Sequence, residues 1–178
     1  MEKPRGIMVF GANGSGKTTL GRELACILNF KFIDVEAYFF EESEIPYTAV
    51  RSREEVIKLM LDDIFVHGSF VLASCMGNYG DEIPLYYELA VYMEAPLELR
   101  LQRVIDRTYK RFGERACKGG DMYEQECKFY DFVASRPLSD IEEWGATLSC
   151  PVIRVDGTED WRVNAWKIAE WWVKREME

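Results

Sequence analysis

The sequence predicts a three-layer α/β protein, in which a five-stranded parallel sheet carries helices on both faces. Two observations support this prediction. Five short apolar runs alternate with segments of helical spacing, and such strand–helix repeats build parallel sheets. The first run, residues 6–10, leads directly into a glycine-rich segment, residues 11–18, and then into a helical pattern that continues to residue 28. A tight glycine turn is therefore expected at the carboxyl end of the first strand.

That glycine-rich segment, Gly11-Ala12-Asn13-Gly14-Ser15-Gly16-Lys17-Thr18, matches the phosphate-binding loop G-x-x-x-x-G-K-[ST] at every fixed position. Glycines let the backbone approach phosphate oxygens, and successive N–H groups at a helix start attract an anion. We expect Lys17 to contact the β- and γ-phosphates of a nucleotide and Thr18 to hold Mg²⁺. The alternative is a chance glycine-rich turn. The nucleotide-binding residues expected here are Gly11, Asn13, Gly14, Ser15, Gly16, Lys17, Thr18 and Thr19.

The remaining elements follow from apolar periodicity and turn signals. Ser52 and Glu55 have the spacing of a capping box, which opens a helix that ends near residue 67. The tryptophans of the last helix are interpreted as sheet packing, with nucleobase stacking by Trp161 as the alternative. Strands are expected at 30–34, 70–74, 89–93 and 151–156, and helices at 35–40, 52–67, from 96 onward, at 121–133, 138–144 and 160–174.

Composition restricts the possible functions. The 178 residues fit a single domain, and the net charge of −9 argues against nucleic-acid and anionic-membrane binding. The five cysteines are scattered without a C-x-x-C pair, and there is one histidine, so neither a zinc site nor a disulfide framework is expected. No secretion signal or membrane-spanning stretch is recognised. We expect a cytoplasmic protein that is a monomer or a homodimer.

Two carboxylates, Asp34 and Glu36, follow the second predicted strand. Ligands of open α/β sheets lie outside the carboxyl ends of the strands, so this pair should lie near the phosphate loop. Asp34 is expected to place Mg²⁺, directly or through water, or to take the proton of a substrate hydroxyl. Its alternative role is to cap the following helix. Glu36 is expected to contact the substrate.

A basic stretch interrupts this acidic chain between residues 100 and 118. Arginines at 100, 103, 107 and 111 recur at helical spacing and so share one helix face. The glycine-containing segment that follows is interpreted as a lid over residues 108–121, which would bring arginines to a transferring phosphate. We expect Arg107 to bind nucleotide, and Arg111 and Arg115 to act in catalysis. The alternative is an ordinary amphipathic helix paired with surface carboxylates.

The phosphate loop, the Phe32-Ile33-Asp34-Val35-Glu36 segment and the basic lid together resemble the P-loop small-molecule kinases, above all the shikimate kinase family, with gluconate and adenylate kinases as relatives. The resemblance implies the P-loop NTPase fold. It also implies substrate-binding roles for Arg51, Gly77 and Arg136 and an adenine-binding role for the turn at Asp156. Cys75-Met76-Gly77 stands where that family has three glycines, and Glu36 stands where it has a second aspartate, so shikimate itself is not expected as the substrate.

The sequence thus predicts an ATP- and Mg²⁺-dependent phosphotransferase that acts on the hydroxyl of a small anionic metabolite. Lys17, Asp34, Arg111 and Arg115 are its expected catalytic residues. Two alternatives stay open: a nucleotide or nucleoside kinase, and a nucleotide-binding regulatory module without transfer activity. The second alternative arises because Ser74 stands where many P-loop enzymes carry an aspartate that supports Mg²⁺.

Overall fold

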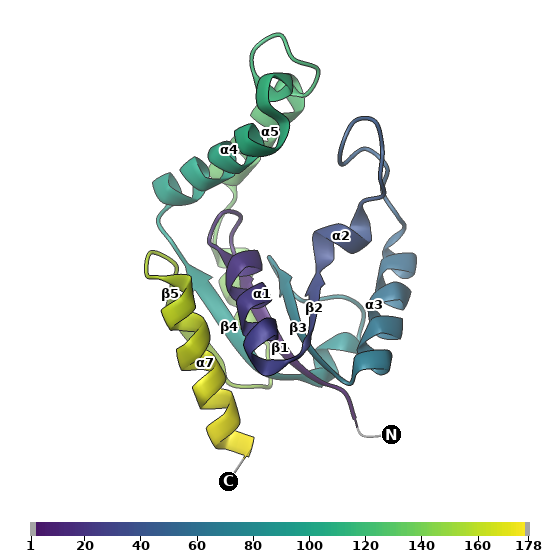
Figure 1. The fold of residues 1–178 in the computed structure, drawn as a ribbon, viewed down its shortest axis with the longest axis vertical. Coiled ribbons are helices and arrows are strands. Elements are labelled where there is room, and N and C mark those ends of the chain that lie inside the picture. The colour runs from purple at the N-terminus through teal and green to yellow at the C-terminus, as the bar shows by residue number, and fades with distance from the viewer. Residues whose placement is uncertain (1–2, 177–178) are drawn as a thin grey trace.

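The structure is a computed structural model that describes residues 3–176 (Figure 1). Its five strands form one parallel sheet in the order β2-β3-β1-β4-β5. The predicted fold class is thereby confirmed. The strands are β1 (Arg5–Gly11), β2 (Lys31–Asp34), β3 (Ser69–Ser74), β4 (Tyr87–Glu94) and β5 (Val152–Asp156). The helices are α1 (Lys17–Leu28), α2 (Val35–Phe39), α3 (Arg53–His67), α4 (Leu97–Phe112), α5 (Tyr123–Ser135), α6 (Ser139–Ala146) and α7 (Trp161–Glu176), with 3₁₀ turns η1 (Ile83–Tyr86) and η2 (Gly113–Ala116).

Two apolar cores lie on opposite faces of the sheet, because side chains alternate between faces along each strand. In β1, Met8 and Phe10 join the core that α3 and α6 cover, whereas Ile7 and Val9 join the core that α1 and α7 cover. All four side chains are at most 1% exposed. The central strand is therefore buried on both faces, as its continuous apolar run predicts.

The capping box of α3 forms as predicted. The Ser52 hydroxyl accepts a hydrogen bond from the backbone N–H of Glu55, and the Glu55 carboxylate accepts one from the backbone N–H of Ser52.

The expected packing of the tryptophans against the sheet holds for Trp172, which is 2% exposed, but it is wrong for Trp166, which is 63% exposed. No helix within residues 3–176 combines the length and the apolar character needed to cross a membrane.

Helices α4 and α5 form an arm that projects beyond the carboxyl end of the sheet, and the loop after α2 faces it (Figure 1). Three polar contacts join arm and loop. Arg111 donates to the Tyr47 hydroxyl, Arg115 Nη2 donates to the Glu44 carbonyl oxygen at 3.2 Å, and Gln125 Nε2 donates to the Pro46 carbonyl oxygen at 3.2 Å. The lid segment expected at 108–121 is the end of α4 together with η2 and the turn that follows it.

We predict that Ile64→Ala lowers the free energy of unfolding by about 2–5 kcal/mol, because it removes three buried carbons from the α3 core and leaves a cavity. Urea unfolding measures the change. Val66→Ala, at a side chain that is 79% exposed on the same helix, is the matched control and should change stability little. Equal effects of the two substitutions would contradict the described packing of α3.

Candidate active site

The phosphate loop connects β1 to α1 and depends on glycine at its centre. Gly14 has φ of 79°, and a Cβ placed there would overlap the backbone carbonyl of Arg100 on α4. Gly16, with φ of 106°, is the residue that caps the start of α1. The first backbone N–H groups of a helix have no acceptor within it. Together with the positive end of the α1 dipole, they make the loop suitable for binding an anion.

Two arginines of α4 hold the arm against this loop. Arg100 is 4% exposed and donates from Nε to the Ala95 carbonyl oxygen at 3.1 Å and from Nη1 to the Asn13 carbonyl oxygen at 3.4 Å. Arg103 donates to the carbonyl oxygens of Ser15 at 3.4 Å and Gly157 at 2.9 Å. The predicted basic helix face is therefore real, but its first two arginines contact backbone carbonyls of the loop and of the turn after β5.

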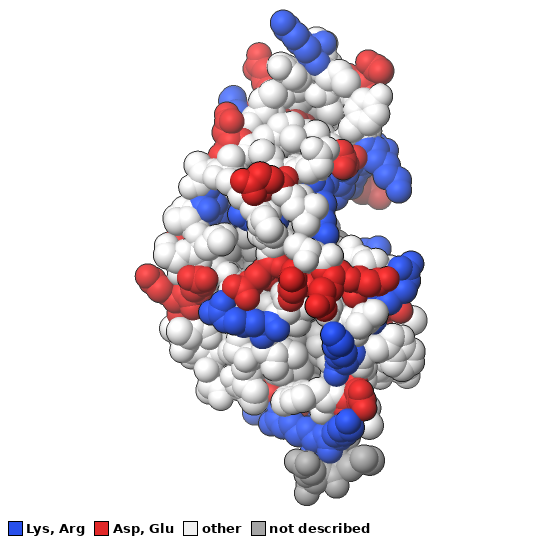
Figure 2. All heavy atoms as spheres, turned by 90° about the vertical axis from the view of Figure 1, so that its left-hand side faces the viewer, with Lys and Arg blue, Asp and Glu red and all other residues white. Residues whose placement is uncertain are grey.

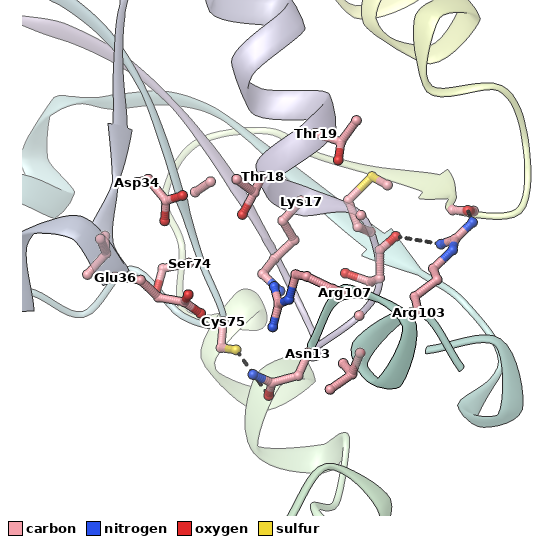
Figure 3. A pocket seen from close by; sticks show the side chains of 18 of the residues that line it. Asn13, Lys17, Thr18, Thr19, Asp34, Glu36, Ser74, Cys75, Arg103 and Arg107 are labelled. Atoms are coloured by element: carbon pink, nitrogen blue, oxygen red, sulfur yellow. Dashed lines mark hydrogen bonds between the residues drawn. The ribbon is translucent and has the colours of Figure 1, made fainter. Parts of the chain in front are cut away.

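A cavity of about 640 Å³ opens in front of the loop, a volume typical of small-molecule sites. Lys17 from α1, Asp34 from the end of β2, Glu36 from α2 and Arg107 from α4 all line it (Figure 3). Thr18, Thr19, Ser74, Cys75, Tyr79 and Trp161 are also among its lining residues. The cavity thus brings cationic side chains and a pair of carboxylates together at the carboxyl ends of the strands.

Lys17 lies over the phosphate loop, 9% exposed, and its Nζ donates to the Ala12 carbonyl oxygen at 2.8 Å. Burial lowers the pKa of its ammonium, while the nearby Cys75 and Glu36 partly offset this effect. Arg107 also contributes to the lowering, since it places a second positive charge close by. Figure 3 shows the Lys17 and Arg107 side chains pointing into the same part of the cavity. Two neighbouring cations favour a ligand with concentrated negative charge.

The carboxyl group of Asp34 has a raised pKa, chiefly because it is partly buried and also because Glu36 adds a negative charge nearby. Arg22 and Arg107 oppose this shift. Asp34 and Glu36 face the cavity on the side opposite Arg107 (Figure 3). A carboxylate whose pKa is raised accepts a proton more readily, as a general base must.

The residues present suit a nucleotide phosphate and its metal ion. The Ser15 hydroxyl is fully buried, and no hydrogen-bond partner is found for it in the described part of the chain. Thr18 and Asp34 offer oxygen atoms on one side of the cavity, and Mg²⁺ is commonly held by one or two protein oxygens together with phosphate oxygens and water. Ser74, at the end of β3, shares a hydrogen bond with the Tyr79 hydroxyl.

Charge on the molecular surface is distributed to match this site. Figure 2 shows basic side chains in the hollow between the arm and the body, and a band of acidic side chains across the body below it. An acidic protein with a basic hollow directs small anions toward that hollow.

Other predicted residues lie at the edges of the site or outside it. Arg111 contacts Tyr47 and borders a neighbouring cavity, whereas Arg115 lines neither of these two cavities and pairs with Asp121 at 2.7 Å. The Asp156 carboxylate accepts the backbone N–H of Thr158 at 2.8 Å and so shapes the turn after β5. Asp156 itself lines a separate hollow beside β4.

The substrate-side residues suggested by family resemblance are more dispersed. Arg51 pairs with Glu41 at 3.2 Å and donates to the Tyr38 carbonyl oxygen at 2.9 Å, and it does not line the main cavity. A Cβ at Gly77 would overlap the Tyr87 hydroxyl and the Met8 sulfur. The absence of a side chain at Gly77 therefore allows these two residues to pack closely. Arg136 lies close enough to Lys17 to lower the pKa of that ammonium.

Sequence reasoning missed the aromatic residues around the site. Phe39, Phe40 and Tyr79 line the main cavity, and Tyr47 joins the arm to the facing loop. No motif marks these positions, and they come from three separate segments. Only the fold could bring them together.

The fold and the phosphate loop, together with the relatives described below, identify a P-loop small-molecule kinase. A family model described as "AAA domain" matches residues 7–128, which is more than half of the chain, and the chain therefore belongs to this family. The matched residues contain the phosphate loop, both cavity carboxylates and the whole of α4. Together with the shikimate kinase relatives described next, this match confirms the predicted resemblance to P-loop kinases.

Individual relatives agree with this assignment. The chain is 31% identical over 170 residues to the uncharacterized protein YqaC of Bacillus subtilis (strain 168), covering 90% of this chain and 92% of YqaC. It is 29% identical over 119 residues to a shikimate kinase of Clostridium botulinum (strain ATCC 19397 / Type A), covering 58% of this chain and 66% of that enzyme. A solved shikimate kinase from Acinetobacter baumannii in complex with shikimate shares the fold, with a TM-score of 0.54, 20% identity and coverage of 99% and 97%.

We predict that Lys17→Ala weakens ATP binding about 10- to 100-fold, since a charge-assisted hydrogen bond contributes about 1.5–3 kcal/mol. The fold should stay intact, because an ammonium whose burial is unfavourable is removed. Calorimetric titration with ATP and Mg²⁺ measures the affinity, and Lys58→Ala, on the exposed side of α3, is the control. Unchanged affinity in Lys17→Ala would refute the assigned role of the loop.

We also predict that Glu36→Gln lowers the pKa of Asp34, because the substitution removes a neighbouring negative charge. In the native protein, Asp34 should keep its proton to a higher pH than an ordinary aspartate with pKa 3.8, and the variant should ionise at lower pH. Carbon-13 NMR of the carboxyl group gives both values. Glu42→Gln, in the neighbouring exposed loop, is the control. A pKa that stays the same in both variants would contradict the pairing of Asp34 with Glu36.

Proposed function

We propose that this protein transfers the γ-phosphoryl group of ATP, with Mg²⁺, to a hydroxyl of a small anionic molecule. One observation carries the proposal: Lys17 and Arg107 line the same cavity as Asp34 and Glu36, directly in front of the phosphate loop. Phosphoryl transfer needs positive charge around the moving group and a base beside the attacking hydroxyl. Both requirements have candidate residues here.

Each residue receives a separate role in this proposal. The backbone N–H groups of residues 14–18 hold the phosphates, and Lys17 and Arg107 stabilise the charge that develops on the transferring group. Thr18 would be a ligand of the metal ion. Asp34 accepts the proton of the attacking hydroxyl, or it would help to hold the metal ion through water. A bond forms between the acceptor oxygen and the γ-phosphorus as the bond from phosphorus to the ADP oxygen breaks.

The turn after β5 has a supporting role on the nucleobase side. Gly157 and Trp161 line the cavity, and Arg103 fixes the Gly157 carbonyl. We propose that the base lies between this turn and the start of α4. A cytoplasmic location and a monomeric or homodimeric state stay predictions.

A further prediction follows from the role of Asp34. Asp34→Asn should lower kcat about 10²- to 10⁴-fold, the usual contribution of a general base, with little change in ATP affinity. ATP consumption is followed with a panel of hydroxylated acids, sugars and nucleosides as acceptors. Asp62→Asn, at an exposed position of α3, is the matched control. Restoration of turnover by excess Mg²⁺ would assign Asp34 to the metal rather than to the proton.

The same assay separates transfer from regulation. A protein that binds ATP but consumes it at the background rate with every acceptor would be a nucleotide-binding module without transfer activity. That outcome would reject the proposed function and leave the nucleotide site in place.

A further inference from the structure

A second cavity, of about 400 Å³, lies under the arm, beside the nucleotide cavity. Glu36, Phe40 and Arg107 line both cavities, so they form the border between them. A molecule in the second cavity would therefore present one end to the region between Lys17 and Asp34. This is the place that the proposed function requires for the acceptor, and the following inference rests on that function.

Four aromatic rings line part of this second cavity, beside polar side chains of α2, α4 and α5. Phe40 and Tyr47 come from the segment after α2, with ring centroids 5.0 Å apart, while Phe112 and Phe129 come from the arm. Four rings offer broad apolar surface and few hydrogen-bonding groups. A flat ring gains about 1–3 kcal/mol by stacking on one aromatic side chain, a gain that a polyol without a ring cannot make. The walls favour a planar ligand.

The inner end of the cavity holds a buried carboxylate. Glu126 on α5 is 4% exposed, and the Thr108 hydroxyl donates to its Oε2 at 3.0 Å. Within residues 3–176, no lysine or arginine forms an ion pair with Glu126. A buried carboxylate is costly unless several donors satisfy its oxygens. The neighbouring Gln125 adds an amide that can both donate and accept. This end therefore favours a ligand that donates N–H groups.

The backbone conformation of Tyr47 also indicates a binding site at this cavity. Tyr47 has φ of 68°, unusual for a residue other than glycine and costly for a bulky side chain. Its ring lies 6.3 Å from that of Phe112, and the Arg111 guanidinium lies 5.2 Å from its centroid. Such strain persists where surrounding contacts impose it, and it is frequent at binding sites. Here those contacts close the cavity between loop and arm.

We propose that the acceptor carries a planar nitrogen heteroaromatic ring with amino or ring N–H donors. The ring packs on the aromatic side chains that line this cavity, its donors face Glu126, and its hydroxyl-bearing end reaches past Arg107 toward Asp34. The aromatic walls and the buried carboxylate together distinguish this acceptor from the polyol acids that the family resemblance alone suggests.

The test uses three groups of probes, with binding followed by saturation-transfer NMR and transfer followed by ATP consumption. Adenosine, cytidine and their 5′-monophosphates carry both ring and N–H donors. 4-(Hydroxymethyl)benzoate carries a ring without such donors, and gluconate and shikimate carry no aromatic ring. We expect the first group to bind at least tenfold more tightly than the other two.

Variants locate the binding. Glu126→Gln should weaken the first group about tenfold or more and leave 4-(hydroxymethyl)benzoate unchanged, a selectivity that a general loss of structure would not produce. Phe129→Ala should weaken both aromatic groups. Tyr109→Ala, at a side chain on α4 that is 57% exposed and outside the cavity, is the control and should change neither.

The possible failures are distinguishable. Turnover of gluconate or shikimate, with no binding of the aromatic probes, would overturn this inference and leave the kinase function standing. Binding of the aromatic probes without ATP consumption would support the cavity assignment and reject the transfer function. Absence of binding by all probes, or equal effects of Glu126→Gln on both aromatic groups, would also overturn the inference.

Discussion

The close approach of α4 to the phosphate loop is the constraint on which the rest of the site depends. It is possible because Gly14 has no Cβ, so the Arg100 carbonyl can lie against the loop backbone. Arg100 and Arg103 then fix the contact through four backbone carbonyls, of which three belong to the phosphate loop or to the turn after β5. The direction of α4 is set at this point. Every residue further along the helix, including Arg107 and Phe112, takes its position from it.

Because of this arrangement, the arginines along one face of α4 have two different roles. Arg100 and Arg103 satisfy backbone carbonyls, which keeps their guanidinium groups hydrogen-bonded although they are partly buried. One turn later Arg107 lines both cavities, and one further turn brings Arg111 to the Tyr47 ring. Burial of Arg100 lowers the pKa of its guanidinium, yet arginine stays charged under ordinary conditions. Regular spacing on a helix therefore produces structural charges at the base of the arm and binding charges further along it.

The sheet, its order of elements and the phosphate loop could be predicted from the sequence because their signals are local. Apolar runs, a capping box and a fixed motif each lie within a few residues. The aromatic cavity could not be predicted, since Phe40, Tyr47, Phe112 and Phe129 are far apart in the chain and carry no periodic signal. For Arg51 and Arg115, the sequence predicted a ligand-binding role that the contacts of these side chains do not favour. The family resemblance suggested ligand binding for Arg51 and the basic lid suggested it for Arg115, but nearby Glu41 and Asp121 pair with them in the structure.

Glu36 and its neighbour Phe40 connect the two halves of the site. Both belong to the short segment that follows β2, and both line the nucleotide cavity and the aromatic cavity. Asp34 lies at the end of β2 itself, where pairing with β3 fixes its backbone, so its distance from the phosphate loop is set by the sheet. Glu36 and Phe40 lie beyond the sheet, on an element that contacts the arm through Tyr47. The chemistry of transfer therefore depends on the rigid sheet, whereas the choice of acceptor depends on how the arm and the loop after α2 meet.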